Sequence, residues 1–191
     1  MTKTAIAPGP YLVPMPTVLV GSMVEGRPNF MAAAFCAIVN FRPATIACGL
    51  SPKHRTCRGI EAAGVFSINL PTVEQVEITD HCGLVSGDRV DKSTLFEVFS
   101  GSLGAPMIAE CPVTAECRLV GSTPLAVDTV YLGEIVTVHA EESVLTDGEL
   151  DWSKLRPLIF TFPKGHYWRL GEHVAKAWHV GKGFPPSKPE K

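Results

Sequence analysis

Hydrophobic and polar positions along the first third of the chain predict β-strands joined by tight turns. Residues 17–24 (TVLVGSMV) are rich in branched side chains, and residues 25–28 (EGRP) have the composition of a hairpin turn. Residues 29–39 continue as a second, almost wholly apolar strand, and residues 44–50 (ATIACGL) as a third. The sequence therefore predicts a hairpin with one deeply buried arm, followed by another buried strand.

A helix is expected directly after the third strand. Ser51 has an N-cap side chain and is followed by Pro52, a residue favoured at the first helical position. The helix should therefore cover residues 52–63 and stop at Gly64. Residues 65–70 (VFSINL) then predict a fourth strand.

The middle of the chain combines one further helix with loops. Thr72 and Gln75 stand at the spacing of a capping box, which predicts a helix over residues 72–81. Residues 82–112 are typical of loop and short helix, and residues 95–99 (LFEVF) are expected to form the helical part.

The later part of the chain again predicts strands. Residues 113–120 and 130–139 alternate as half-buried strands do, and they look like an antiparallel pair around the break at residues 122–124. Residues 158–162 and 166–170 complete the set. Several short strands and a few helices, without βαβ alternation or internal repeats, indicate a mainly β fold. We expect a small closed β-barrel with helical additions.

The composition fits one domain. The chain has 191 residues, of which 46% are hydrophobic and 19% charged, enough for one well-filled core and cramped for two. We therefore expect a single domain over residues 1–181. Residues 182–191 (KGFPPSKPEK) are polar and rich in proline, which predicts a flexible C-terminal tail.

Charge and cysteine content argue against several classes of protein. The net charge is −2 and the 17 basic residues are scattered, so nucleic acid is not an expected partner. Uncharged runs are too short to span a bilayer and the N-terminus lacks a secretory pattern, so we expect a cytoplasmic protein without membrane association. The six cysteines form no CxxC pair and mostly have apolar neighbours, as reduced structural thiols do.

Several familiar catalytic motifs are missing from the sequence. It contains no GxxxxGK[ST], GxGxxG after a strand, GxSxG or HExxH, which removes the main support for phosphate-loop NTPases, Rossmann dehydrogenases, α/β-hydrolases and zincins. His166, His173 and His179 match no familiar ligand spacing, so no metal site is expected.

The strongest candidate for chemistry lies within residues 26–70. Ala32, Ala33 and Ala34 leave room for a flat group against the backbone, although small residues also serve close packing. The turn that follows residue 50 supplies donors suited to a phosphate, beside the unpaired N–H groups of a helix N-terminus: Ser51, Lys53, His54, Arg55 and Thr56. Ser51 and Thr56 could instead be simple caps. Together these features predict a site for a flat cofactor with an anionic tail, either a flavin nucleotide or pyridoxal phosphate.

The order of longer motifs resembles a known family. GRPNFMAAAF, IACGLSPKHRT, FSINLP, GLVSGDRVDKS, CPVTAECRL, YLGEIV and HYWRLGE follow one another as in the flavin reductase-like proteins that bind FMN. Within that family the flavoredoxins look most similar, and the resemblance covers about residues 14–172. It implies an FMN-binding split β-barrel, usually a homodimer with the flavin near the subunit interface.

The resemblance also implies roles for particular residues. The segment that runs along the isoalloxazine is matched by Asn29, Met31, Ala32, Ala33, Ala34, Phe35 and Cys36. The phosphate-binding turn is matched by Ser51, Lys53, His54, Arg55 and Thr56. Asn69 lies on a strand whose end approaches the flavin, and Lys92 matches a lysine that reaches the FMN from a distant loop. The charge of Lys92 suits either the phosphate or the N1/O2 edge of the ring, where negative charge gathers on reduction. Without the resemblance, Lys92 could equally be an exposed loop lysine.

Some positions depart from the family pattern or leave a choice. Phe35 stands where the flavoredoxins look to have a tryptophan, which keeps a ring contact of smaller area. Asp128 stands where a histidine is frequent, a change that would lower the flavin's reduction potential or redirect a substrate contact. Tyr167 and Trp168 match an aromatic pair that covers the flavin; either one can stack, or both can belong to the core.

The function implied by the resemblance is redox chemistry centred on bound FMN. Electrons would pass from NAD(P)H or a redox protein to free flavin, a metal complex or a protein partner, and no side chain needs to act as a nucleophile. The leading expectation is a flavin-dependent oxidoreductase of the NAD(P)H:flavin or ferric reductase type. The alternatives are an FMN-dependent electron carrier without nicotinamide turnover and a non-redox ligand-binding barrel.

Overall fold

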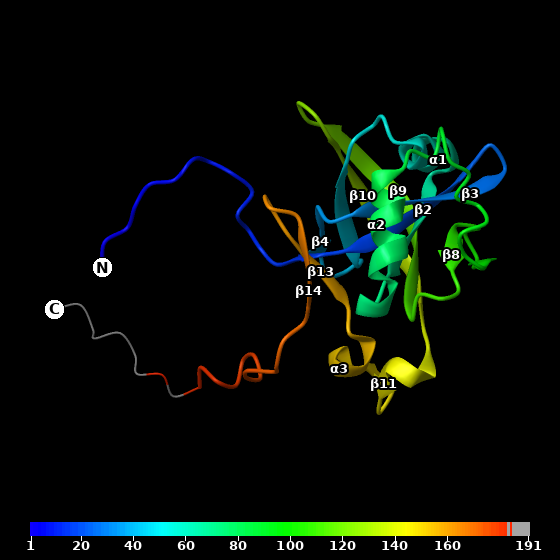
Figure 1. Ribbon diagram of the computed structural model, residues 1–191. Helices are drawn as coiled ribbons and strands as arrows, with labels where there is room; N and C mark the ends of the chain where they lie inside the picture. Colours follow the sequence, from blue (N-terminus) through cyan, green and yellow to red (C-terminus); the bar gives the residue numbers. More distant parts are fainter. Residues whose placement is uncertain (183, 185–191) are drawn as a thin grey trace.

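An antiparallel sheet forms the body of the protein. In the computed structural model, which describes residues 1–182 and 184, seven strands pair in the order β3-β2-β6-β9-β10-β5-β4 (Figure 1). Their bounds are Val18–Val24 (β2), Arg27–Ala33 (β3), Cys36–Asn40 (β4), Thr45–Leu50 (β5), Val65–Leu70 (β6), Val113–Pro124 (β9) and Thr129–Ala140 (β10). Phe66 and Tyr131 are among the fully buried side chains of its main apolar core.

The chain passes from one edge of this sheet to the other at Ala34 and Phe35. β3 and β4 follow each other in sequence, yet they are the two edge strands. The predicted mainly β class is confirmed. The expected closed ring of hydrogen bonds does not form among the described residues, because the crossing leaves β3 and β4 unpaired with each other. Cys36 N donates to Ala34 O at 2.8 Å, and this tight turn divides the single strand predicted over residues 29–39.

The first helix begins later than its sequence predicts. α1 spans Arg55–Ala63, and its N-cap residue is His54 rather than Ser51. Residues 51–54 form a turn in which His54 N donates to Ser51 O at 3.1 Å, so Pro52 precedes the helix. The predicted end is confirmed, because Gly64 adopts a left-handed conformation with φ of 67°.

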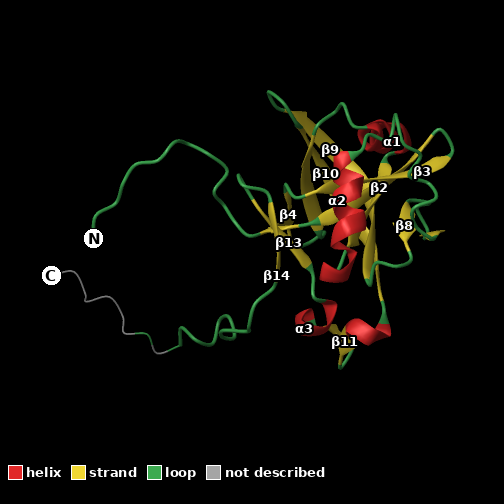
Figure 2. Cartoon of the chain, viewed as in Figure 1, coloured by secondary structure: helices red, strands yellow, loops and turns green. Residues whose placement is uncertain are grey.

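The capping box of the second helix is confirmed. Thr72 N donates to Gln75 Oε1 at 2.9 Å, and a short 3-10 turn, Val73–Gln75 (η1), leads into α2, Val76–Leu84. Figure 2 shows α2 lying in front of the sheet, where it packs against β3.

The helix predicted over residues 95–99 is wrong. Phe96 is buried against Phe30, with ring centroids 5.4 Å apart, and the chain then enters β7, Val98–Ser100, which pairs with β8, Pro106–Ile108. Burial of the aromatic ring and pairing with β8 override a local helical pattern of only five residues.

The predicted antiparallel pair β9 and β10 is confirmed, and both strands are longer than expected. A second sheet joins β1 (Met15–Pro16), β13 (Leu158–Thr161) and β14 (His166–Arg169). The remaining short elements are η2 (Glu142–Val144), β11 (Leu145–Thr146), β12 (Glu149–Leu150) and α3 (Trp152–Leu155).

The two ends of the chain leave the body on the same side, beside β13 and β14 (Figure 1). The predicted tail, residues 182–191, falls outside the described residues except for 182 and 184. Within the described part of the chain, no helix combines the length and the apolar character needed to cross a membrane. All six cysteines are free and buried.

Candidate functional site

An apolar groove of about 320 Å³ lies where the chain crosses from β3 to β4. One wall is the small-residue stretch from Met31 to Phe35, and the end of β5 supplies Gly49 and Leu50. Aromatic side chains approach from the second sheet: Phe160, Phe162 and Tyr167. A flat, largely apolar group therefore has a matching surface here.

The alanine stretch serves packing as well as the groove. A Cβ on Gly83 of α2 would lie 3.4 Å from the Cβ of Ala32, so small residues on both sides let the helix approach β3 closely. Ala32 and Gly83 also line the groove. Ala32 therefore allows close packing and also lines the groove, whereas Ala33 and Ala34 are seen only to line it.

A smaller polar cavity of about 80 Å³ continues from the groove. The two share Met31, Ala32, His54 and Gly83. The polar side chains of the smaller cavity are Asn29, His54, Arg55, Thr56 and Lys92. The structure thus brings residues from β3, α1 and the distant loop at residues 85–97 to one end of an apolar groove.

Thr56 is oriented by a buried hydrogen bond. Asn29 Nδ2 donates to Thr56 Oγ1 at 2.7 Å, and the two residues are 5% and 1% exposed. Because Oγ1 accepts this proton, the hydroxyl's own proton is left for a further acceptor, and the cavity lies beside it. The interpretation of Ser51 and Thr56 as helix caps is wrong, since the N-cap residue is His54.

Lys92 is buried rather than exposed, with 3% of its surface accessible. Its Nζ donates to Phe30 O at 3.0 Å and to Cys82 O at 2.7 Å, and no carboxylate of the described residues forms an ion pair with it. Burial lowers the pKa of Lys92, and the neighbouring Cys82 opposes this shift. The Lys92 ammonium therefore has one N–H without an acceptor and no carboxylate to balance its charge. Both features favour binding of an anion in the adjoining cavity.

His54 lies where the groove meets the polar cavity. Burial and then the charge of Lys92 lower the pKa of His54, while Asp128 acts in the opposite direction. Burial therefore favours the neutral imidazole, and Asp128, which also lines the groove, is the acidic residue that acts against this shift.

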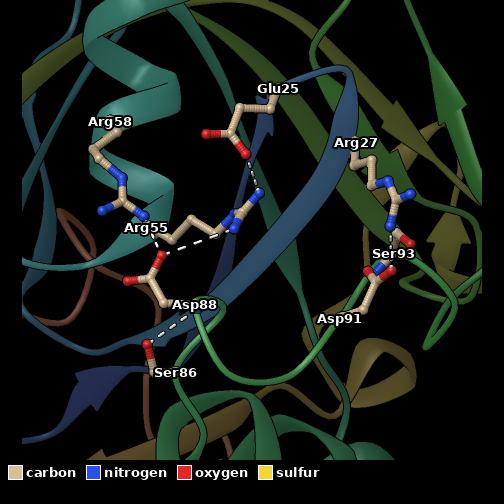
Figure 3. Close-up of polar contacts among 8 residues, drawn as sticks. All are labelled: Glu25, Arg27, Arg55, Arg58, Ser86, Asp88, Asp91 and Ser93. Carbon is tan, nitrogen blue, oxygen red and sulfur yellow. Dashed lines mark hydrogen bonds and ion pairs between the residues drawn. The ribbon is translucent and has the colours of Figure 1, made fainter.

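Ion pairs tie the loop that carries Lys92 to β3 and α1 (Figure 3). Arg55 bonds Glu25 at 2.8 Å and approaches Asp88 at 3.8 Å, and Arg58 also pairs with Asp88. Nearer Lys92, Arg27 Nη1 donates to Asp91 Oδ2 at 2.9 Å. Arg55, predicted from sequence to bind phosphate, thus lines the polar cavity while its guanidinium holds this loop in place.

Four predicted site residues lie away from both cavities. Lys53 is exposed on the turn before α1, and Cys36 is buried in the core opposite Cys48 of β5. Asn69 is fully buried, donates to Leu19 O and Ser67 Oγ, and accepts from Ile108 N, each at 2.9 Å. Its amide is satisfied within the fold.

Trp168 is the fourth of these residues. It is 56% exposed and its Nε1 donates to Thr161 Oγ1 at 2.8 Å, whereas Tyr167 lines the groove and donates its hydroxyl to Asp80 at 2.9 Å. Successive side chains of a strand point to opposite faces, so only one of the pair reaches the groove. The structure assigns that position to Tyr167.

Sequence reasoning missed several lining residues. Thr17, Phe160 and Phe162 contact the groove but belong to segments whose local pattern indicates only strands. Gly83 contacts it as the first residue of GLVSGDRVDKS, where sequence assigned it no role. Their place at the groove follows from the packing of the second sheet and α2 against the crossing, which local sequence does not reveal.

Comparison with known proteins agrees with this architecture. The flavin reductase like domain family matches residues 11–168. The structure is similar to the flavoredoxin from Methanosarcina acetivorans, with a TM-score of 0.94 and 40% identity over 97% of this chain and 100% of that chain. It is also similar to the flavoredoxin of Desulfovibrio vulgaris (Miyazaki F), with a TM-score of 0.89 and 34% identity over 94% and 100% of the two chains.

A third solved structure, an FMN-binding protein from Thermus thermophilus with bound 1-cyclohex-2-enone, has a TM-score of 0.76 and 26% identity over 92% of this chain and 98% of that chain. The matched family spans most of the sequence, including both cavities. This chain is a member of the flavin reductase like family.

Proposed function

We propose that the protein binds FMN, with the isoalloxazine in the apolar groove and the phosphate in the adjoining polar cavity. The observation that carries this proposal is the buried ammonium of Lys92, which has two carbonyl acceptors and no ion-pair partner among the described residues. It stands at the end of a groove walled by alanines and aromatic rings. A flat apolar ring with an anionic tail complements both parts.

The chemistry of the donor set fits a phosphate. The Thr56 hydroxyl proton and the third N–H of Lys92 are both available beside the small cavity. Charge-assisted hydrogen bonds of this kind are the stronger ones in proteins. Gly87 supports the same geometry, since a Cβ at this position would clash with the Asn29 side chain that orients Thr56.

Pyridoxal phosphate fits the same cavities less well. It is held through a Schiff base to a lysine, and no lysine is found among the described residues that line the groove. Lys92 lies in the polar cavity, where its Nζ already bonds two backbone carbonyls. These contacts support a flavin over pyridoxal phosphate.

Bound FMN would supply reversible transfer of electrons or hydride. The chain's own residues hold the phosphate through Lys92 and Thr56, set the ring against residues 31–35, and exclude water with Phe160, Phe162 and Tyr167. Asp128 places a carboxylate at the groove. Because like charges repel, this side chain favours the less negatively charged state of a bound flavin ring. No side chain is required as a nucleophile.

We further propose that the protein is an FMN-dependent oxidoreductase. It would pass electrons from NAD(P)H or a protein donor to free flavin, a metal complex or a partner protein. The similarity to two flavoredoxins supports a second candidate, an electron carrier without nicotinamide turnover. NADH and NADPH oxidation with added FMN distinguishes the two: turnover supports the enzyme, and reduction by a protein donor alone supports the carrier.

A homodimer is the proposed assembly. β4 is an edge strand, and its apolar side chains Ile38 and Val39, together with the neighbouring Phe41, are exposed. An exposed apolar edge strand tends to pair with another chain. A second copy of this chain would cover these side chains. Sedimentation analysis should give twice the chain mass of 20.5 kDa, and a monomer would contradict the dimer.

The cysteines bear on the location of the protein. The six free thiols fit a reducing compartment, so we propose a cytoplasmic location.

The FMN proposal is tested by the absorption spectrum of freshly purified protein and by titration of the apoprotein with FMN. Oxidised-flavin bands and saturable FMN binding are the expected results. A colourless protein that fails to bind FMN would contradict the proposal and favour a non-redox ligand-binding barrel.

A further inference from the structure

Thr17 has a buried hydroxyl group without a partner. The residue follows β1 and is 5% exposed, and its backbone N donates to Leu158 O at 3.0 Å. Among the described residues, only Thr17 Oγ1 and Thr79 Oγ1 are buried side-chain oxygens or nitrogens with no hydrogen-bond partner. Burying a hydroxyl without a partner carries a free-energy cost, so such a group calls for an explanation.

The two threonines differ in their surroundings. Thr17 lines the apolar groove, whereas Thr79 is fully buried within α2 and lines neither the groove nor the polar cavity. A ligand in the groove would therefore meet the unpaired hydroxyl of Thr17. Thr79 serves as a matched comparison, because its hydroxyl is also unpaired but lies outside both cavities.

The strand register places Thr17 at the end of the groove away from the polar cavity. On β2 and β3, Asn29 is opposite Ser22 and Ala33 is opposite Val18, so Thr17 lies beside Ala34. Asn29 lines the polar cavity. At about 3.3 Å per strand residue, the five residues from Asn29 to Ala34 span about 16 Å. A ligand anchored by its phosphate near Asn29 would thus reach Thr17 with its ring system rather than with its phosphate-bearing chain.

We propose that Thr17 Oγ1 hydrogen-bonds a heteroatom on the edge of the bound flavin ring, which makes Thr17 a positioning residue for the ring. A threonine hydroxyl can donate to a ring oxygen or nitrogen and can accept from a ring N–H, so it suits the polar edge of a flavin. This inference rests on the proposed binding of FMN. It adds a contact that is independent of the phosphate.

The test uses Thr17→Val, which removes the hydroxyl and keeps the shape, Thr17→Ser, which keeps the hydroxyl, and Thr79→Val as the matched control. Affinities for FMN and riboflavin, the visible bands of the bound flavin and the melting temperature of the apoprotein are measured. Thr17→Val should weaken binding of both ligands by the same factor, roughly fivefold to thirtyfold, because the ring atom loses its partner. The bands should shift, and the apoprotein should melt no earlier than the wild type.

Thr17→Ser should stay within about threefold of the wild-type affinities, because its hydroxyl can make the same bond. Thr79→Val should leave affinity and spectrum unchanged. Wild-type affinity and unshifted bands in Thr17→Val, in a protein that binds FMN, would overturn the role of Thr17 alone. If the wild-type protein bound neither FMN nor riboflavin, the proposed function would fail together with this inference.

Discussion

Asn29 Nδ2 and Thr56 Oγ1 form a 2.7 Å hydrogen bond that joins β3 to the first turn of α1. The bond lies beside the polar cavity, which both residues line, Asn29 from the strand and Thr56 from the turn predicted to bind phosphate. It fixes which way the Thr56 hydroxyl proton can point, and so links the fold to phosphate recognition.

Thr56→Val should weaken FMN binding by about 1.5–3 kcal/mol, because it removes a hydrogen bond to the charged phosphate. Riboflavin, which lacks the phosphate, should lose much less. Titration of the apoprotein with both ligands measures the difference, and Thr56→Ser should keep most of the FMN affinity. Equal losses for FMN and riboflavin would show that Thr56 does not contact the phosphate.

Replacing Lys92 should have a comparable effect. Lys92→Met removes the buried ammonium, and we expect FMN binding to weaken by about 1.5–3 kcal/mol while riboflavin binding changes little. Lys53→Met is the matched control, because Lys53 is exposed on the turn before α1 and should change FMN binding by less than about threefold. Unchanged FMN binding in Lys92→Met would remove this residue from the site.

Raising the pH should reduce the preference for FMN over riboflavin. Burial lowers the pKa of Lys92 below its ordinary value of 10.5. Only the protonated amine attracts phosphate, so FMN affinity should be full below that lowered pKa and fall as the pH rises through it. A bound phosphate favours the ammonium and moves the midpoint upward in the complex.

The ratio of the two dissociation constants, measured from about pH 7 upward, tests this dependence, since a phosphate monoester is already largely dianionic there. Lys92→Met should give a ratio that does not change in this range. A constant ratio in the wild-type protein would contradict the assignment of the titrating group to Lys92.

Loosening the loop over the polar cavity should speed the exchange of FMN. Asp88 pairs with Arg58 and approaches Arg55, so Asp88→Asn releases contacts that hold the loop to α1. We expect the FMN dissociation rate in stopped-flow experiments to rise about twofold to fivefold, with a small effect on stability because these pairs are partly exposed. Glu134→Gln, which breaks the Arg118 pair at 3.2 Å on another part of the sheet, is the control. Equal rates in both variants would contradict this role of the loop.

Local chemistry in the sequence predicted some elements well. The Thr72–Gln75 capping box and the Gly64 stop depend on neighbouring residues alone, and both occur as expected. The start of α1 does not, because Ser51 belongs to a separate turn before the helix: its carbonyl accepts from His54 N and from Cys57 Sγ at 3.3 Å. The break at Ala34 likewise reflects the crossing between sheet edges.

The site was predictable to the extent that its parts are contiguous in sequence. The alanine stretch and Thr56 could be identified directly, whereas Lys92 depended on resemblance to a family. The ammonium of Lys92 bonds a carbonyl of β3 that is 62 residues away and one of α2 that is 10 residues away, and neither bond is visible in local sequence. Asn69 also depended on the resemblance alone, and in the structure its amide ties β6 to β8 and lies away from both cavities. Thr17 carried no signal, because a missing hydrogen-bond partner appears only once the chain is folded.

The central claim is that the groove and the polar cavity together hold FMN by its ring and its phosphate. Its most direct test is a paired titration of the apoprotein with FMN and riboflavin, followed through the visible flavin spectrum. FMN should bind at least about tenfold more tightly than riboflavin, the equivalent of one charge-assisted contact to the phosphate. Equal affinities for the two ligands, or binding of neither, would contradict it.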